Sequence, residues 1–332
     1  HETAILVLKR DAGASSTQGL VSSALAGLSR TALLETRKLR IRILEVDDNR
    51  LGSAGAVEAA LRELRSVASA PSGEALEVRH ADEGRLVRIQ ERAVPAPAGA
   101  PWRKDGCYLI AGGVGGIGLR FCELLAGRVK AVGLIGRSSL PPQKKVILDT
   151  FALKGTEYVY ERADLTDTAS VNSALARIRE RTGAFHGVFH SGGQLEDGLL
   201  ITKTREAFSK VYDPKVLGAW ALHEATKGDP LDFFTVFSSI VSVIGNMGQA
   251  DYGAANAFLD AFAAWRGAGD YPGRSLSVNW TLWADGGMGQ SEAVLKQLST
   301  LGIMPLQSVH ALQAFERIAH AAVPQYAVVQ GE

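Results

Sequence analysis

Short apolar runs alternate with segments of helical periodicity over the C-terminal two thirds of the chain. We interpret each run as a buried strand and each periodic segment as a helix with one apolar face. The predicted strands are Cys107–Ala111, Ala131–Ile135, Tyr158–Tyr160, Gly187–His190, Phe233–Phe237, Leu276–Asn279 and Tyr326–Val329, the last after a helix at Ser308–Ala321. Strands separated by helices predict an α/β fold with a doubly wound parallel sheet, and such sheets bind ligands beyond the carboxyl ends of their strands.

The N-terminal third alternates in the same way, but it has no glycine-rich phosphate loop and no cluster of catalytic residue types. Residues 1–93 are therefore predicted to be a structural, non-catalytic subdomain. Residues 94–101, rich in Pro and Ala, are predicted to link it to residues 102–332. The predicted elements are strands at Ala4–Leu8 and Leu39–Val46, helices at Thr17–Leu34 and at Ser53–Val67 with Ser53 as N-cap, and strands at Leu76–Arg79 and Arg85–Ile89 joined by a turn at residues 82–84.

Composition excludes several classes of protein. Hydrophobic residues make up 46% of the 332 residues and the formal net charge is +1, so nothing indicates binding to nucleic acid or to a membrane surface. The longest apolar stretch, residues 233–244, is broken by Ser238 and Ser239 and is too short to span a membrane. The seven histidines show no ligand-like spacing with Cys or acidic residues, so no metal site is expected.

Two further features concern the cellular compartment of the protein and the extent of its chain. Cys107 and Cys122, the two cysteines, lie in a predicted strand and the helix after it. Two buried thiols in a chain of this length indicate a reducing, cytoplasmic compartment, and no secretory signal is visible. The chain begins at His1 and enters a predicted strand almost at once, which predicts a piece of a longer polypeptide.

Five glycines fall within seven positions just after the strand at Cys107–Ala111. Gly113, Gly115 and Gly118 satisfy the pattern G-x-G-x-x-G, and a strand before it and a helix after it provide the context in which this pattern binds a dinucleotide. Glycine permits a tight turn and lets backbone N–H groups approach a pyrophosphate at the helix N-terminus. The alternative is a glycine turn that binds nothing.

Arg137 and Ser138 follow the next strand. An acidic residue at this place bonds the ribose 2′-hydroxyl of NAD, whereas a basic residue suits the 2′-phosphate of NADP. The sequence therefore predicts NADPH rather than NADH; a solvated arginine at a strand end is the alternative. Asp164, after the third strand, is a candidate partner for the adenine amine, with a helix N-cap as the competing role.

A candidate reactive group gathers near the fifth strand, which Ser238 and Ser239 follow. Tyr252 and Asn256 are four residues apart in a predicted helix and share one face. A phenol can protonate the alkoxide left by hydride transfer to a ketone if a nearby cation lowers its pKa, and Lys215 is the candidate cation. A serine hydroxyl on the carbonyl oxygen would orient and polarise it. Alone, a helical Tyr is more often structural, so the combination carries the prediction.

Together these motifs resemble the ketoreductase domain of modular polyketide synthases, a branch of the short-chain dehydrogenase/reductases. The matching stretches are LIAGGVGGIG, LIGRS, GVFHSGG, TVFSSI, GQADYGAANAFLDAFA and SVNWTLWADGGMG. The resemblance is close from Trp102 to the C-terminus. It is looser over residues 1–93, where SALAGLSRTALLE and RIRILEVD resemble the family's truncated, Rossmann-like structural subdomain, here without its first elements.

The resemblance implies a role for each matching residue. Tyr252 would donate the proton, Ser239 would hold the carbonyl oxygen, Lys215 would lower the pKa of Tyr252, and Asn256 would support a relay water. Most short-chain dehydrogenases carry Lys four residues after the Tyr; the Asn at this place favours the polyketide branch. The implied cofactor-binding residues are Gly112, Gly113, Gly115, Gly116, Ile117, Gly118, Arg137, Ser138, Asp164, Leu165, Ser191 and Gly192.

A short acidic loop bears on stereochemistry. Leu195, Glu196 and Asp197 stand where one ketoreductase class carries Leu-Asp-Asp, and Ile244 stands where the opposite class carries Trp. The resemblance therefore implies the B-type class, which makes a D-configured 3-hydroxyl, with the loop guiding the phosphopantetheine arm. An exposed acidic loop is the alternative. Met288, in a candidate lid at residues 284–303, is predicted to guide the substrate as well.

The predicted reaction is the NADPH-dependent reduction of a β-ketoacyl thioester, carried on an acyl carrier protein, to a β-hydroxyacyl thioester. Neighbouring polyketide synthase domains would be further partners. Three alternatives stay open: a catalytically silent copy of the domain, a free-standing dehydrogenase for a small ketone, and epimerisation of an α-substituent with or without reduction. Ala111, Ser191 and Thr281 depart from the family's usual residues, and none of these departures removes a catalytic group.

Overall fold

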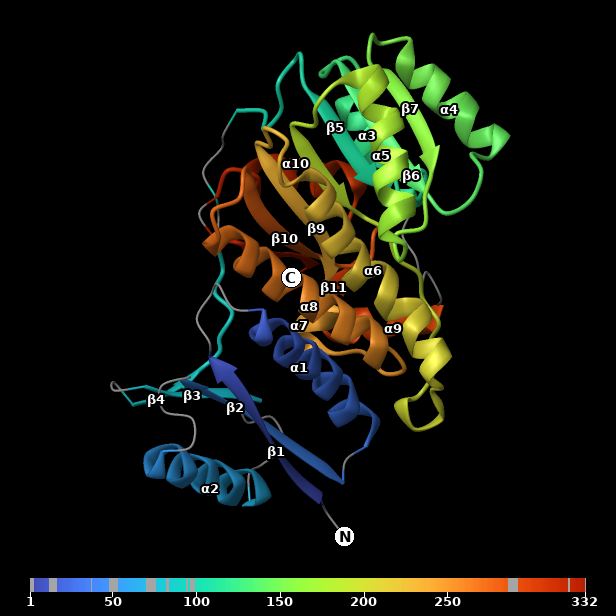
Figure 1. Cartoon of the computed structure of the whole chain (residues 1–332). Coiled ribbons are helices and arrows are strands. Elements are labelled where there is room, and N and C mark those ends of the chain that lie inside the picture. The colour runs from blue at the N-terminus through green and yellow to red at the C-terminus, as the bar shows by residue number, and fades with distance from the viewer. Residues whose placement is uncertain are drawn as a thin grey trace.

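The two main sheets of the fold, a larger and a smaller one, are each associated with helices (Figure 1). The structure is a computed structural model, and it describes residues 3–11, 17–36, 38–47, 53–69, 76–81, 84–93, 95, 99–285, 292–321 and 323–331. Within these residues, no helix is long and apolar enough to cross a membrane.

The larger sheet has seven strands in the described part of the chain, in the order β12-β10-β9-β8-β5-β6-β7. All neighbouring strands pair in parallel. This is the doubly wound α/β fold that the sequence predicts. The strands are β5 (Cys107–Ala111), β6 (Ala131–Gly136), β7 (Glu157–Arg162), β8 (Gly187–His190), β9 (Phe233–Ser239), β10 (Arg274–Trp280) and β12 (Gln325–Val328).

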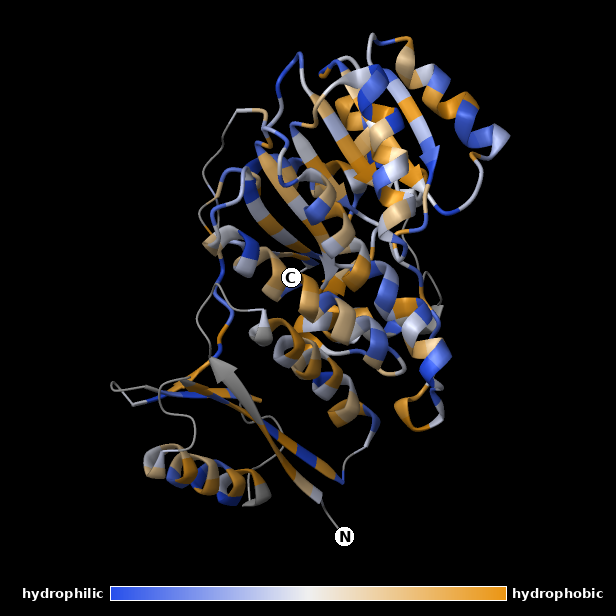
Figure 2. Ribbon diagram, viewed as in Figure 1, coloured by the Kyte–Doolittle hydropathy of each residue, from blue (hydrophilic) through white to orange (hydrophobic). Residues whose placement is uncertain are grey.

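Helices cover both faces of this sheet, because its strands are apolar on both sides (Figure 2). One buried cluster joins α5, α6 and α8 to the sheet, and the other joins α3, α4 and α10 to it. The bounds are α3 (Gly116–Leu125), α4 (Pro142–Ala152), α5 (Thr168–Thr182), α6 (Arg205–Thr226), α7 (Val241–Ile244), α8 (Ala250–Ala268), α9 (Glu292–Thr300) and α10 (Ser308–Ile318).

The smaller sheet lies in the N-terminal third. Its strands are β1 (Thr3–Asp11), β2 (Leu39–Asp47), β3 (Glu77–Ala81) and β4 (Gly84–Val87), of which the last two are antiparallel. Helices α1 (Gln18–Glu35) and α2 (Ala54–Ser69) connect the parallel strands. The Ser53 hydroxyl accepts a hydrogen bond from the Ala56 N–H, which confirms the predicted N-cap.

Helix α1 joins the two parts of the molecule. It lies between the smaller sheet and α8 (Figure 1), and Leu20 and Ala24 on α1 belong to the same buried cluster as α8. The two helices approach most closely at two glycines. A Cβ on Gly27 would stand 2.2 Å from the carbonyl oxygen of Gly253, which is the residue after Tyr252. The contact therefore requires the absence of a side chain at residue 27.

The predicted strands and helices agree with the structure to within a few residues at their ends. Short elements escaped prediction: the turn η2 (Leu200–Thr202), helix α7 and a two-stranded antiparallel pair of β11 (Ile303–Met304) and β13 (Gln330–Gly331). They are too short for periodicity to reveal them. The division into subdomains at residues 94–101 stays a prediction, and that linker is only partly described.

The glycine contact gives a test of the joint between α1 and α8. Replacement of Gly27 by Ala should destabilise the protein by about 1–3 kcal/mol, because the added methyl meets backbone and Ala257 Cβ, 2.6 Å away. Gly19→Ala, in the same helix with nothing within 4 Å, is the matched control and should be neutral or slightly stabilising. Urea denaturation measures both; equal stabilities of the two variants would contradict this contact.

Candidate active site

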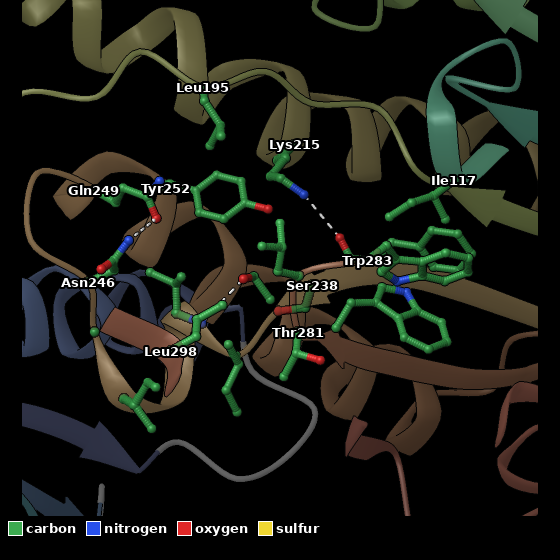
Figure 3. Close-up of a pocket in the computed structure, with 18 of the residues that line it drawn as sticks. Ile117, Leu195, Lys215, Ser238, Asn246, Gln249, Tyr252, Thr281, Trp283 and Leu298 are labelled. Carbon is green, nitrogen blue, oxygen red and sulfur yellow. Dashed lines mark hydrogen bonds between the residues drawn. The ribbon is translucent and has the colours of Figure 1, made fainter. Parts of the chain in front are cut away.

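A cavity of 140 Å³ lies beyond the carboxyl ends of β8, β9 and β10, where the fold predicts a ligand site. Helices α6 and α8 contribute Lys215 and Tyr252 to its wall (Figure 3). The lining residues include Ile117, Ser191, Leu195, Lys215, Phe237, Ser238, Ser239, Ile244, Gln249, Tyr252, Leu298 and Leu301. Three of the four predicted catalytic residues, Ser239, Lys215 and Tyr252, thus meet at one cavity, and Asn256 lies directly behind them.

Tyr252 lies in the first turn of α8, and its side chain extends toward Lys215 in Figure 3, whereas the Lys215 amine is directed along its hydrogen bond to the Phe237 carbonyl. Burial raises the pKa of Tyr252, while hydrogen bonds with the side chains of Ser239 and Asn256 oppose the rise. This direction corrects the expectation of a lowered pKa. The cause is that removing a phenolate from water outweighs the stabilisation that the surroundings supply in this structure.

Lys215 lies on α6 with 3% of its surface exposed. Its amine donates a hydrogen bond to the carbonyl of Phe237 at 3.0 Å and lies 5.4 Å from the centre of the Tyr252 ring. Burial lowers the pKa of Lys215 to about 8, and the carboxylate of Asp260 partly opposes this. The amine is thus close to Tyr252, and it is charged only below about pH 8.

Ser239 ends β9 at the cavity wall, and its hydroxyl accepts a hydrogen bond from the N–H of Val241. A buried polar network holds this strand end. The amide of Asn279 donates to the carbonyl of Ser239 at 3.2 Å and to the carboxylate of Asp260 at 2.9 Å. Asp260 in turn accepts from the hydroxyl of Ser242 at 2.6 Å. The network holds the Ser239 backbone in place at the end of β9, and this fixes the position of the Ser239 hydroxyl at the cavity wall.

Asn256 is fully buried one turn after Tyr252, and its amide donates to the backbone carbonyl of Tyr252 at 2.8 Å. Its side-chain oxygen has no hydrogen-bond partner among the described residues. Buried acceptors in proteins are normally satisfied, so this oxygen has the capacity to bind a water or a hydroxyl donor. That capacity agrees with the predicted relay role.

The glycine loop is packed too closely for side chains at two of its positions. Gly112 has a φ of +80°, and a Cβ there would lie 2.9 Å from the N atom of Gly192. A Cβ on Gly118 would lie 2.5 Å from the carbonyl oxygen of Gly112. Helix α3 begins at Gly116. Its N-cap residue is Gly115, and no side-chain hydrogen bond caps this helix end within the described structure. The backbone N–H groups of this helix end therefore suit an anion, as a bound pyrophosphate requires.

Arg137 follows β6 as an exposed side chain that donates to the Gln194 side chain at 3.2 Å. Arg162, which the sequence analysis missed, ends β7 opposite Gly136 and donates to the Arg137 carbonyl at 2.9 Å. Only the pairing of β6 with β7 reveals this neighbour. Ser138, also exposed, accepts a hydrogen bond from the Tyr160 hydroxyl through its carbonyl. Two guanidinium groups thus stand at one edge of the sheet.

Asp164 follows β7 and folds back on its own turn, accepting hydrogen bonds from the N–H and hydroxyl of Thr166, which lower its pKa. The N-cap of α5 is Asp167, so the alternative role for Asp164 as helix cap is wrong. Leu165 packs against Gly192, where a Cβ would lie 2.5 Å from a Leu165 methyl. The hydroxyl of Ser191 donates to the Ala111 carbonyl at 2.8 Å and faces the cavity beside Ile117.

The acidic loop reaches the cavity at one residue. Leu195 lines the wall, and Asp197 accepts a hydrogen bond from Gln249, a lining residue that the sequence analysis missed. Glu196 points to the surface and pairs with Lys210. Ile244, at the position compared with Trp, lines the cavity as well. The acidic loop and the residues just before helix α8 thus form one wall of the cavity.

The candidate lid is described in part. Met288 lies outside the described residues, whereas Leu298 on α9 and Leu301 just after it line the cavity. In the described part of the chain, no group of three or more His, Cys, Asp or Glu residues is arranged to hold a metal ion.

A family model and several curated proteins match this chain. A model of the KR domain matches residues 106–285. Polyketide synthase PksN of Bacillus subtilis (strain 168) is 34% identical over 93% of this chain, and polyketide synthase ThaG of Burkholderia thailandensis is 39% identical over 71% of it. These matches cover 6% and 4% of the two relatives, so the chain spans less than a tenth of their length.

Solved structures extend the likeness to the whole chain. A ketoreductase domain from the bacillaene assembly line superposes with a TM-score of 0.87 at 32% identity, covering 100% of this chain and 78% of that one. The first ketoreductase of the tylosin polyketide synthase superposes with a TM-score of 0.82 at 30% identity, covering 99% and 70%. The chain therefore belongs to the KR domain family, the polyketide synthase ketoreductases of the short-chain dehydrogenase/reductase superfamily. This family consists of oxidoreductases and implies a nicotinamide cofactor.

Burial of Lys215 predicts a pH-dependent stability. The folded-state pKa is about 8, below the ordinary value of 10.5, so the unfolded chain binds more protons between these pH values and stability rises across them. Lys215→Met should therefore be more stabilising at pH 7 than at pH 10, by about 2 kcal/mol. Urea denaturation at both pH values measures this difference. Lys210→Met, at a lysine with 59% of its side chain exposed, is the control and should show no such change.

Proposed function

We propose that this domain reduces a β-ketoacyl thioester, carried on an acyl carrier protein, to a β-hydroxyacyl thioester with NADPH. One observation carries the proposal: a phenol, an amine and a serine hydroxyl from three different elements meet at one cavity, beside a glycine turn of the dinucleotide-binding kind. A silent copy of the domain would have no need to keep this arrangement. Because the matched relatives are polyketide synthases of far greater length, we propose neighbouring synthase domains as further partners.

In the proposed mechanism the substrate carbonyl enters the cavity between Tyr252 and Ser239. The Ser239 hydroxyl donates a hydrogen bond to the carbonyl oxygen and polarises it. NADPH, when bound at the glycine turn, would supply the hydride that the carbonyl carbon accepts. The Tyr252 hydroxyl gives its proton to the resulting alkoxide oxygen, so the product is a hydroxyl. The raised pKa keeps Tyr252 protonated before the reaction, and it therefore holds the proton that it must donate.

Lys215 and Asn256 support the proton donor. The Lys215 ammonium, close to the Tyr252 ring, stabilises the phenolate that proton transfer creates. Asn256, with its unpaired buried oxygen, holds a water through which a proton returns to the phenolate. Both residues act on Tyr252 rather than on the substrate.

The cofactor would lie across the carboxyl ends of the strands. Gly112, Gly113, Gly115, Gly116 and Gly118 would admit the pyrophosphate to the N-terminus of α3, with Ile117 beside it. Arg137, together with Arg162 and Ser138, would bind the 2′-phosphate. The remaining groups that we assign to the cofactor are Asp164 and Leu165 near the adenine, and Ser191 and Gly192 near the nicotinamide end.

We infer a B-type outcome, the D-configured 3-hydroxyl. Support comes from Leu195, which lines the cavity at the head of the acidic loop, and from Ile244, which leaves room where the opposite class carries Trp. The loop of Leu195, Glu196 and Asp197 would guide the phosphopantetheine arm from one side. Met288 belongs to the same proposal.

Replacement of Tyr252 by Phe removes the proton donor, together with its hydrogen bonds to the Ser239 and Asn256 side chains, and keeps the ring. We expect turnover to fall by roughly 10²–10⁴-fold, the usual contribution of a general acid, with cofactor binding intact. The assay is NADPH oxidation with a β-ketoacyl N-acetylcysteamine thioester, and NADPH fluorescence reports binding. Tyr212→Phe, at a tyrosine that packs against Phe208 on α6, is the control. A Tyr252→Phe variant with near wild-type turnover would refute the assignment.

Arg137→Asp places a carboxylate where the 2′-phosphate would bind. We expect the ratio of kcat/KM for NADPH to that for NADH to fall by at least about tenfold, because a charge-assisted pair becomes a repulsion. Arg181→Asp, at an exposed arginine on α5, controls for the change in net charge. If selectivity is unchanged in Arg137→Asp, the phosphate binds elsewhere.

A further inference from the structure

Two segments on the substrate side of the cavity are joined to each other along their length. One is the acidic loop and its continuation, residues 195–204, and the other is residues 245–251, the turn before α8 with the first two residues of that helix. The N–H of Gly198 donates to the carbonyl of Gly248 at 2.9 Å, and the Gln249 amide donates to Asp197 at 3.0 Å. Each segment carries lining residues, Leu195 on the first and Gln249 on the second. Their separation therefore sets the width of the cavity on this side.

A buried ion pair crosses between the same segments. Lys203 and Asp251 are 2.6 Å apart, and each side chain is only 2% exposed. The Lys203 amine also donates to the carbonyl of Glu196 at 2.7 Å, and the other oxygen of Asp251 accepts from the N–H of Tyr252 at 2.8 Å. A continuous series of contacts thus runs from the acidic loop to the backbone of the proton donor. A buried pair contributes little net stability after desolvation, so its effect here is geometric.

A third contact comes from the N-terminal third of the chain. Glu35, the last residue of α1, accepts a hydrogen bond from the N–H of Leu200 at 2.7 Å with one carboxylate oxygen. With the other oxygen it accepts from the N–H of Gly248 at 3.0 Å. One carboxylate therefore holds both segments, and Thr31 on the same helix accepts from the N–H of Asn246. Neither Glu35, Lys203 nor Asp251 lines the cavity.

We propose that Glu35, Lys203 and Asp251 form a clamp that fixes the two substrate-side segments, and that these positioning residues determine which face of the substrate carbonyl is reduced. The second half of the proposal rests on the proposed function. A displacement of about 1 Å at a reacting group changes rates by up to about 100-fold. A loosened wall would admit the substrate in both orientations, and the rates of reduction at the two carbonyl faces would then become more similar. The clamp would give the N-terminal subdomain a part in specificity.

The test uses variants that leave no unpaired buried charge. In Lys203→Met/Asp251→Asn the ion pair is gone, while the Asn oxygen still accepts from Tyr252. In Glu35→Ala both acceptors are lost, and Glu35→Gln keeps one. Lys210→Met is the matched control for Lys203, because Lys210 also contacts Glu196 but only through its exposed carboxylate. Glu58→Ala, at a side chain 75% exposed in the N-terminal third, is the control for Glu35.

Hydrogen exchange and product analysis are then measured on the full chain. We expect faster exchange at the Leu200 and Gly248 amides in Glu35→Ala. With a β-ketoacyl N-acetylcysteamine thioester we expect the ratio of the two hydroxyl enantiomers to drop about tenfold in both clamp variants and KM to rise, with Glu35→Gln intermediate. The NADPH Kd should stay within about twofold of wild type, since the clamp lies away from the α3 turn.

The outcomes separate the two proposals. Unchanged exchange in Glu35→Ala, or unchanged enantiomer ratio and KM in folded clamp variants, overturns the clamp. Control variants that change the ratio as much as the clamp variants overturn it too. A wild-type chain that reduces no thioester refutes the proposed function and the role in specificity, while the exchange rates still decide whether the clamp holds the two segments.

Discussion

The close packing of α1 against α8 is the constraint on which the rest of the structure depends. Gly27 and Gly253 bring the two backbones so near that no side chain fits at residue 27. The same helix α8 packs against α6, β9 and β10, so it ties the cavity wall to the sheet and to the N-terminal third at once. Because Tyr252 immediately precedes Gly253, the place of the phenol is set by a contact made outside the larger sheet.

Burial dominates the electrostatics of the cavity. It raises the pKa of Tyr252 and lowers the pKa of Lys215, and so both groups shift toward their neutral forms. Asp260, held by Ser242 and Asn279, opposes the shift at Lys215. A phenol that keeps its proton lies beside an amine with a pKa of about 8, and the protonation of this pair responds to any further charge that enters the cavity.

The order of elements was predictable because hydrophobic periodicity is local. The strand at Cys107–Ala111 and the glycines after it have the same bounds in the sequence and in the structure. Tyr252 and Asn256 were recognisable as neighbours because helical spacing alone puts them on one face.

By contrast, Arg162 is a neighbour of Arg137 only through the pairing of β6 with β7, and Asp260 meets Asn279 only across α8 and β10. Contacts of this kind depend on sheet order and register, which no short motif encodes. The predicted direction of the Tyr252 pKa shift was wrong for a related reason, since burial is a property of the packed molecule.

The apolar contact between α1 and α8 also determines where a domain of this kind could be cut for transfer into another multidomain protein. Leu20 and Ala24 are buried with α8 in one cluster, so a graft that takes residues 102–332 alone would expose that cluster and leave the backbone N–H groups of Leu200 and Gly248 without the carboxylate they share. A transplantable unit must therefore include α1 along with the larger sheet, because a junction placed at residues 94–101 would separate α1 from the buried cluster that it shares with α8.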